Sequence, residues 1–189
     1  MYFLLYLIKI EAMKKLLVCL CLLVTGFNYA QQTVKSKNLK LKYTPPLGWN
    51  AKEFGGVSPW EERETDLKLC NCSGVLFTKS DKEGQLNVLV YPSTVSGLDS
   101  TKRNNIGKLQ FADVQKYEKT KNKHFSFEVK RSNFLQMPFK TKSYDVIRYF
   151  AKVEDHYYII FAWQENTNAL NSTSEKTLYE MVNAIEPMN

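Results

Sequence analysis

The sequence is poor in the residues that most often carry catalysis or bind metal ions. It has two histidines and four cysteines among 189 residues. His124 and His156 belong to no H-x-x-x-H or H-E-x-x-H arrangement, so zinc hydrolysis has no recognisable motif. The chain also lacks a G-x-S-x-G motif and the glycine patterns that bind nucleotide phosphates. We therefore expect no catalytic residues, no bound metal and no cofactor, and we favour a non-enzymatic protein.

Long hydrophobic runs are confined to the first 30 residues. Met13-Lys14-Lys15 precedes the apolar run 16–24, and the small residue Ala30 is suited to cleavage before Gln31. An N-terminal membrane anchor is the alternative, but neither apolar piece reaches the roughly 20 residues of a spanning helix. We predict that residues 1–30 are a cleaved signal peptide. The mature chain then has no transmembrane span and is exported, periplasmic or secreted, in a bacterium.

The charge of the chain is positive but modest. Removing residues 1–30 takes away three lysines and one glutamate, which lowers the formal net charge from +7 to +5. A dedicated nucleic-acid-binding protein has a denser basic surface, and we expect no nucleic-acid partner.

Two cysteines, Cys70 and Cys72, remain in the mature chain. Residues i and i+2 of an extended segment share a face, but their Cα atoms lie near the upper limit of disulfide reach. The pair is interpreted as small, half-buried thiols or a strained bridge around Asn71. The alternative is redox or metal chemistry, which would need a further ligand or a helix N-terminus beside the thiols.

The mature chain is divided into a flexible leader, residues 31–40, and a single domain, residues 41–189. Alternating or continuous apolar patterns predict strands at 41–43, 74–78, 86–91 and 125–131, and a hairpin at 145–163 whose turn is 154–156. The run from Tyr157 to Trp163 is apolar or aromatic throughout, so we expect both faces of this strand to be covered. Residues 133–141 are expected to form a loop.

Two helices are predicted to provide that cover. The first spans 101–117, with an imperfect apolar stripe interrupted by Gly107. The second spans 173–186, where Ser172 and Glu175 form a capping box. Its apolar stripe consists of Leu178, Met181, Val182 and Ile185. The predicted fold is α+β, an antiparallel sheet covered by helices on both faces.

The order of these elements resembles the PsbP-like family, named after an extrinsic subunit of photosystem II. The resemblance rests on Pro46-Leu47-Gly48-Trp49, the paired strands at 74–91 and 145–163, and the helix 173–186, and it covers about residues 41–187. It implies an α/β/α sandwich that acts as a binding or assembly module and seldom as an enzyme.

Lysines are concentrated between residues 116 and 142, a segment that contains eight basic and two acidic residues. The candidate binding residues are Lys119, Lys121, Lys123, Phe134, Phe139, Lys140 and Lys142. They favour contact with an anionic partner, namely an acidic protein, a polysaccharide or an anionic membrane surface. The alternative is a solvated, lysine-rich edge that discourages sheet aggregation.

These observations favour an exported, non-enzymatic binding or assembly module of the cell envelope. Two alternatives stay open: an exported thiol- or metal-dependent enzyme that uses Cys70 and Cys72, and an immunity-type protein that binds a secreted toxin.

Overall fold

The computed structural model describes residues 32–55, 73–93, 105–106, 109–113, 118–136, 143–154, 156–165 and 169–188. The chain from Thr33 to Asn189 forms one compact unit, separate from Met1–Gln32. Within the described ranges, most residues are in strands and a single helix is present. No helix in these ranges is long and apolar enough to cross a membrane.

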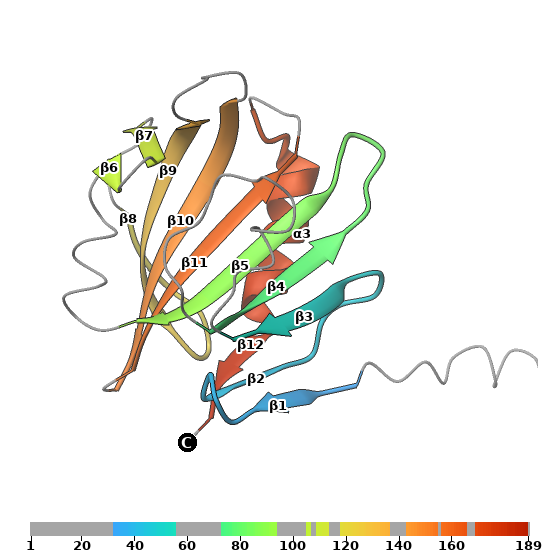
Figure 1. The fold of residues 1–189 in the computed structure, drawn as a ribbon, viewed down its shortest axis with the longest axis vertical. Coiled ribbons are helices and arrows are strands. Elements are labelled where there is room, and N and C mark those ends of the chain that lie inside the picture. The colour runs from blue at the N-terminus through green and yellow to red at the C-terminus, as the bar shows by residue number, and fades with distance from the viewer. Residues whose placement is uncertain are drawn as a thin grey trace, which may run out of the picture. The chain divides into compact units, whose positions relative to one another are not determined.

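The strands form two antiparallel sheets (Figure 1). The small sheet has the order β1-β2-β12, and the large sheet has the order β3-β4-β5-β11-β10-β9-β7-β6, with β8 also paired to β9. The elements are β1 (Val34–Ser36), β2 (Leu41–Tyr43), β3 (Asn50–Phe54), β4 (Gly74–Lys79), β5 (Leu86–Ser93), β6 (Asn105–Ile106), β7 (Leu109–Asp113), β8 (Glu118–Lys121), β9 (Ser126–Gln136), β10 (Ser143–Val153), β11 (His156–Gln164), α3 (Ser172–Asn183) and β12 (Ile185–Pro187).

The predicted hairpin at 145–163 is confirmed and lies at the centre of the large sheet. Strands β10 and β11 pair from Val146↔Trp163 to Val153↔His156, and Glu154 turns the chain with a φ of 49°. Strand β9 pairs with the outer edge of β10, and β5 pairs with the outer edge of β11. Because the side chains of β11 are buried on both faces from Tyr158 onward, the expectation of two covered faces is also confirmed.

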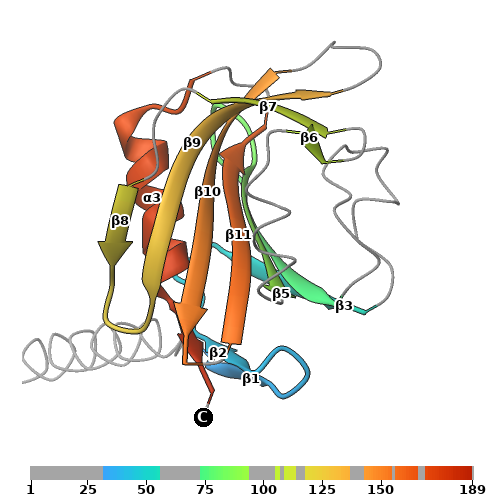
Figure 2. The same ribbon diagram turned by 90° about the vertical axis from the view of Figure 1, so that its left-hand side faces the viewer.

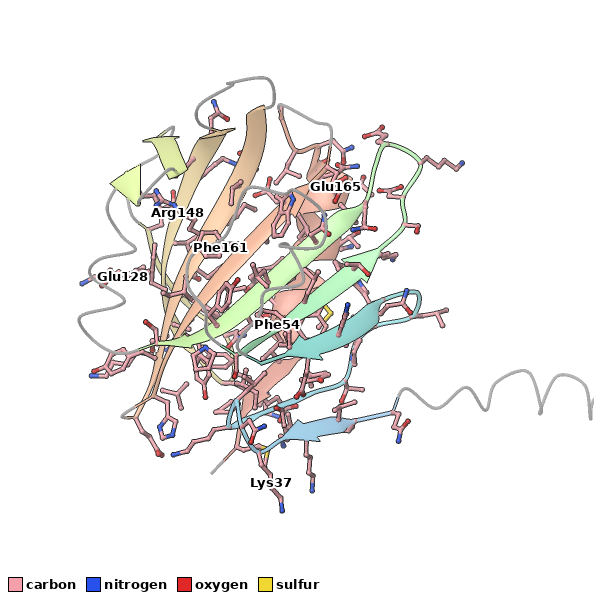
Figure 3. The ribbon with its side chains drawn as sticks, in the orientation of Figure 1. Lys37, Phe54, Glu128, Arg148, Phe161 and Glu165 are labelled. Atoms are coloured by element: carbon pink, nitrogen blue, oxygen red, sulfur yellow. The ribbon has the colours of Figure 1, made fainter. Side chains whose placement is uncertain are left out.

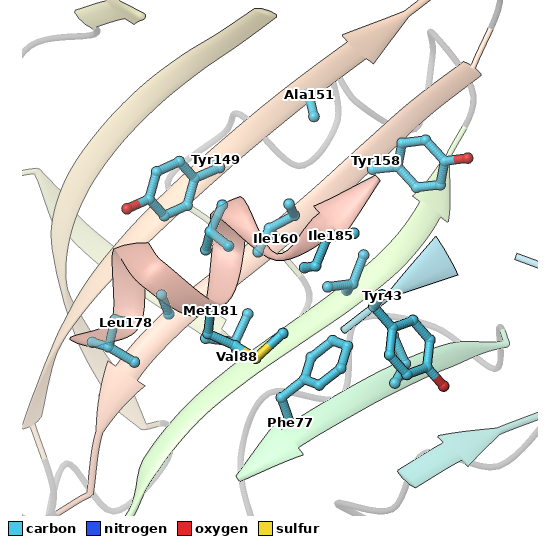
Figure 4. Packing of buried hydrophobic residues seen from close by; sticks show 14 of the residues in the cluster. Tyr43, Phe77, Val88, Tyr149, Ala151, Tyr158, Ile160, Leu178, Met181 and Ile185 are labelled. Carbon is cyan, nitrogen blue, oxygen red and sulfur yellow. The ribbon is translucent and has the colours of Figure 1, made fainter. Parts of the chain in front are cut away.

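Helix α3 covers one face of this sheet. Leu178, Met181, Val182 and Ile185 are fully buried, as the apolar stripe predicts, and they pack with Val88, Tyr149 and Ile160 of the sheet (Figure 4). The helix ends at Asn183, so Ile185 makes its contacts from β12.

The predicted capping box of α3 is wrong. The side chain of Asn171 caps the helix by accepting a hydrogen bond of 2.8 Å from the Ser174 N–H. The carboxylate of Glu175 instead accepts a hydrogen bond from Arg131 Nη2 at 2.7 Å. Asparagine is as good an N-cap as serine, so Asn171 can cap the helix in place of the neighbouring Ser172.

The opposite face of the sheet carries a second apolar cluster without a helix among the described residues. Its buried members are Leu76, Leu89, Tyr91, Val146, Phe150, Ile159, Phe161 and Trp163. The α/β/α sandwich with helices on both faces is therefore wrong: in the described residues, the large antiparallel sheet has one helix, α3, on one face.

The helix predicted for residues 101–117 accounts for this error. The described parts of that segment are strands, and β7 pairs with β9 from Leu109↔Gln136 to Asp113↔Ser132. Gly107 and the imperfect apolar stripe give the segment 101–117 little helix propensity. Pairing with the long strand β9 therefore determines that residues 109–113 form a strand. Strand β9 itself continues to Gln136, so residues 133–136 of the predicted loop are in a strand, and residues 137–141 lie outside the described ranges.

Glycines with a positive φ form two turns of the chain. Trp49 is 8% exposed and its N–H donates to the Pro46 carbonyl at 3.1 Å, while Gly48 has a φ of 83°. Strands β4 and β5 form the second hairpin, in which Gly84 has a φ of 134°. A Cβ at Gly84 would lie 2.3 Å from the Glu165 carbonyl oxygen, so only glycine fits.

The segment 31–40 contains strand β1 and is not a flexible leader throughout. Strand β1 pairs with β2 from Val34↔Tyr43 to Ser36↔Leu41, and β2 also pairs with β12. The side chains that face the core are Ser36, Leu39, Leu41 and Tyr43, each at most 4% exposed. This inward row makes residues 34–43 a packed hairpin.

Candidate functional site

The structure places some of the predicted binding residues and leaves others outside the described ranges. Lys119, Lys121 and Lys123 are exposed on β8 and on the turn that follows it. The backbone of Phe134 lies in β9, and its side chain is not described. Phe139, Lys140 and Lys142 lie outside the described residues, so their part in the site stays a prediction.

Two other basic residues of the lysine-rich segment do not contribute to an open surface. Lys130 is 9% exposed. Arg131 points to the helix side of the sheet, where Nη2 contacts Glu175 at 2.7 Å and Nε lies 3.3 Å from Asp145 Oδ1. Burial alone would lower the pKa of Arg131, but the hydrogen bond to Glu175 and the negative charges of Asp145 and Glu175 raise it. Arg131 therefore holds the fold together.

Strand register brings a lysine of β10 next to the lysines of β8. Lys121 is opposite Ser126, Ser126 is opposite Lys152, and Lys152 is opposite Tyr157. Residues directly opposite in neighbouring strands share a face. The Lys152 ammonium lies 5.7 Å from the centre of the Tyr157 ring, a cation–π contact.

Lys119 lies on the same face as Lys121, opposite Glu128 of β9. We call Lys119, Lys121, Ser126, Lys152 and Tyr157 the β8 surface, after strand β8, which lies beside β9 (Figure 2). The surface is on the face of the sheet opposite to α3, because the flanking residues Phe127 and Ala151 pack in the cluster that contains the helix. Its lysines and serine are exposed and its tyrosine is half-buried. Lys152 could not be assigned to this surface from the sequence, because only the register of β8, β9 and β10 places it beside Ser126 and Lys121.

A second basic surface lies on the small sheet. The inward row of the β1–β2 hairpin leaves Lys35, Lys37, Lys40 and Lys42 directed outward. Figure 3 shows Lys37 projecting from the end of the structure formed by this hairpin. In the register of the sheet, Lys35 is opposite Lys42, and Lys42 is opposite Glu186 of β12.

The turn between β8 and β9 adds to this second surface. Lys42 Nζ lies 2.7 Å and His124 Nε2 lies 3.7 Å from the carboxylate of Glu186. The hydrogen bond from Lys42, together with the charges of His124, Lys42 and Lys123, lowers the pKa of Glu186 against the opposing effect of burial. We call the four hairpin lysines with Lys123, His124 and Glu186 the hairpin face; it contains five lysines and one carboxylate.

Hydrogen bonds hold the turn that presents Lys123. The Asn122 side-chain oxygen accepts from the N–H groups of His124 and Phe125 at 2.9 and 2.7 Å. Its side-chain nitrogen donates to the Asn183 side chain at 2.8 Å, which ties the turn to the end of α3. Lys123 therefore projects from a fixed backbone.

The hairpin is likewise fixed to the large sheet. Ser36 and Tyr43 donate to the two carboxylate oxygens of Glu53 on β3 at 3.0 and 2.8 Å. The Tyr158 hydroxyl lies 3.1 Å from the carbonyl oxygens of both Leu39 and Lys40. Burial raises the pKa of Tyr158 to about 12, so the hydroxyl stays protonated and available as a donor at physiological pH.

The parts of the chain that the structure describes contain no cluster of metal-binding side chains. No group of three or more His, Cys, Asp or Glu side chains there is placed to hold a metal ion. Cys70 and Cys72 lie outside those parts, so the thiol and metal interpretations stay predictions. His156 begins strand β11 and His124 pairs with Glu186.

Buried Arg148 also has a structural role. It is fully buried on the face without the helix, where Nη2 donates to the Ser132 hydroxyl at 2.8 Å. Its guanidinium carbon lies 6.0 Å from the centre of the Phe150 ring. Arg148 and Phe161 lie on neighbouring strands of this face (Figure 3).

Comparisons with known proteins give a likeness of fold alone. No protein-family model matches the chain, and a search of curated proteins found no match. A solved structure from Bacteroides thetaiotaomicron has a TM-score of 0.46 and 11% identity, and the match covers 84% of this chain and 48% of that one. The solution structure of cyanobacterial PsbP (CyanoP) from Synechocystis sp. PCC 6803 has a TM-score of 0.49 and 12% identity, and the match covers 86% of this chain and 95% of that one. The chain thus has a weak resemblance in fold to PsbP.

Proposed function

We propose that the protein is an exported, non-enzymatic binding or assembly module of the cell envelope. The observation that supports this function best is the β8 surface, where Lys119, Lys121 and Lys152 are exposed on one face of adjoining strands. Three ammonium groups on a paired backbone attract a negatively charged partner and steer its approach.

The composition of the β8 surface suits an acidic protein or polysaccharide. Tyr157 supplies an amphipathic ring next to the lysines, and Ser126 supplies an exposed hydroxyl. Tyrosine is enriched in protein interfaces because it combines apolar area with a polar tip. Glu128 lies opposite Lys119, so the surface is not uniformly positive and discriminates among anionic partners by charge placement.

Charge reversal tests this assignment. The K119E/K121E variant should capture less of its partner from a cell-envelope fraction than the wild-type protein does, because two attractive charges become repulsive. Bound proteins and glycans are compared after washing at low salt. The wild-type complex should also weaken as the salt concentration rises.

The matched control is K82E/K176E, which makes the same change of charge at exposed lysines of the β4–β5 turn and of α3. The control variant should capture as much partner as the wild-type protein. Equal capture by wild type and K119E/K121E would show that the β8 surface is not the contact site.

A further inference from the structure

We propose that the hairpin face docks the protein onto an anionic lipid bilayer. This inference concerns a different surface from the β8 surface, and it rests on the proposed function only for export of the protein. Two features of the hairpin face support it: the charge and the absence of apolar anchors.

The charge is concentrated and only weakly compensated. Lys35, Lys37 and Lys40 are exposed, and Lys42 directs its ammonium to Glu186. Lys123 adds a fifth cation from the β8–β9 turn, at a position that acts electrostatically on Glu186. Each lysine that reaches an anionic membrane surface strengthens binding by about fivefold. Five together give appreciable adsorption even though each contributes little.

The side chains of the hairpin face suit lipid headgroups better than a protein surface. The face is built from lysines, one histidine and one glutamate, without the Trp, Tyr or Arg that form the centre of most protein interfaces. Large apolar side chains that the described residues expose are Val34, Leu47 and Tyr179. Val34 points to the opposite face of β1 from Lys35, because successive strand residues alternate. The face therefore adsorbs by charge without inserting.

A bilayer presents many anionic headgroups side by side, so lysines from β1, β2 and the β8–β9 turn can engage it at the same time. We therefore assign the face to lipid, and a soluble polyanion is the alternative that the test distinguishes.

Vesicle sedimentation tests the proposal. The protein is expressed from its full sequence and purified as the cell processes it, with its N-terminus determined by mass spectrometry. Vesicles of phosphatidylcholine with about one-third phosphatidylglycerol are compared with vesicles of phosphatidylcholine alone. The protein should bind the anionic vesicles more tightly, and about 0.5 M salt should abolish the difference.

Two triple variants with the same change of charge separate the surfaces. K35Q/K37Q/K123Q should lower the partition coefficient for anionic vesicles by about a hundredfold, since three favourable charges are lost. K119Q/K121Q/K152Q alters the β8 surface; it should retain vesicle binding and lose partner capture from the envelope fraction. Glu186→Gln should strengthen vesicle binding by about fivefold because it removes the carboxylate of the face. Circular dichroism and thermal unfolding show whether each variant is folded.

Several results would overturn the proposal. One is wild-type vesicle binding by K35Q/K37Q/K123Q, and another is an equal loss in K119Q/K121Q/K152Q, which would mean that only net charge matters. A Glu186→Gln protein that bound no better would also contradict it. Finally, a protein that bound dextran sulfate but not anionic vesicles would have a soluble polyanion as its partner.

Discussion

Replacing Phe161 with alanine should lower the free energy of unfolding by about 4 kcal/mol. Phe161 is fully buried on the face of the sheet that has no helix among the described residues, in one cluster with Leu89, Phe150 and Trp163. Truncation removes the burial of the ring and leaves a cavity that its neighbours in two flanking strands fill only in part. Urea denaturation monitored by circular dichroism measures the change, provided that the m-value stays constant.

Tyr179→Ala is the control for this substitution. Tyr179 is 37% exposed on α3, so its replacement should change the unfolding free energy by only about 0.5 kcal/mol. A loss below about 1 kcal/mol for Phe161→Ala would mean that the second face is not a well-packed core. The two-sided burial of β11 would then be wrong.

Replacing Asp145 with alanine should cost about 3 kcal/mol of stability. Asp145 is 6% exposed, and one of its carboxylate oxygens accepts the Leu170 N–H at 3.0 Å just before α3. Its other oxygen lies 3.3 Å from Arg131 Nε. The substitution leaves a partly buried guanidinium with one carboxylate in place of two, and it leaves the Leu170 N–H without its acceptor. Thermal unfolding by differential scanning calorimetry measures the loss.

Glu175→Gln distinguishes this buried contact from an ordinary surface ion pair. Glu175 also contacts Arg131, at 2.7 Å, but its side chain is 44% exposed. Its replacement should therefore cost at most about 1 kcal/mol. If Glu175→Gln lowered the stability as much as Asp145→Ala, the exposed contact between Arg131 and Glu175 would stabilise the packing of α3 on the sheet as much as the buried contact between Arg131 and Asp145 does.

The sequence predicted the central hairpin and α3 because their signals are local and strong. The continuous apolar run of β11 distinguishes a strand buried on both faces from one with a solvated face. The stripe of Leu178, Met181 and Val182 has the period of a helix and has little other explanation. For these elements, intrinsic pattern and tertiary packing agree.

The segments that were mispredicted obtain their structure from distant partners. Strand β7 depends on pairing with β9. The local sequence of residues 101–117 has no strong feature that excludes a helix, so the strand could not be predicted from it. The leader was mispredicted for a related reason. The buried side chains of Leu39, Leu41 and Tyr43 alternate across the predicted boundary at Leu41, so the pattern belongs neither to the predicted leader nor to the predicted domain alone.

The candidate surfaces were predictable only in part. Lys119, Lys121 and Lys123 were identified from local charge, and they are exposed. Their separation into two surfaces follows from strand alternation and the turn at Asn122, which place Lys123 beside Glu186. Lys152 joins the first surface through the register of three strands, and a single sequence does not specify that register.

Both proposals require lysines to be held in place by hydrogen-bonded strands. The β1–β2 hairpin is the part of this structure that the local sequence predicts least well. Hydrogen-exchange mass spectrometry of residues 33–44 tests it directly. We expect protection across this segment. Strand β2 is paired on both edges, the Met188 N–H donates to the Lys40 carbonyl at 2.8 Å, and the Thr44 N–H donates to Ala184. Exchange as fast as that of an unstructured peptide, while β10 and β11 remain protected, would contradict the packed hairpin and the lysine face built on it.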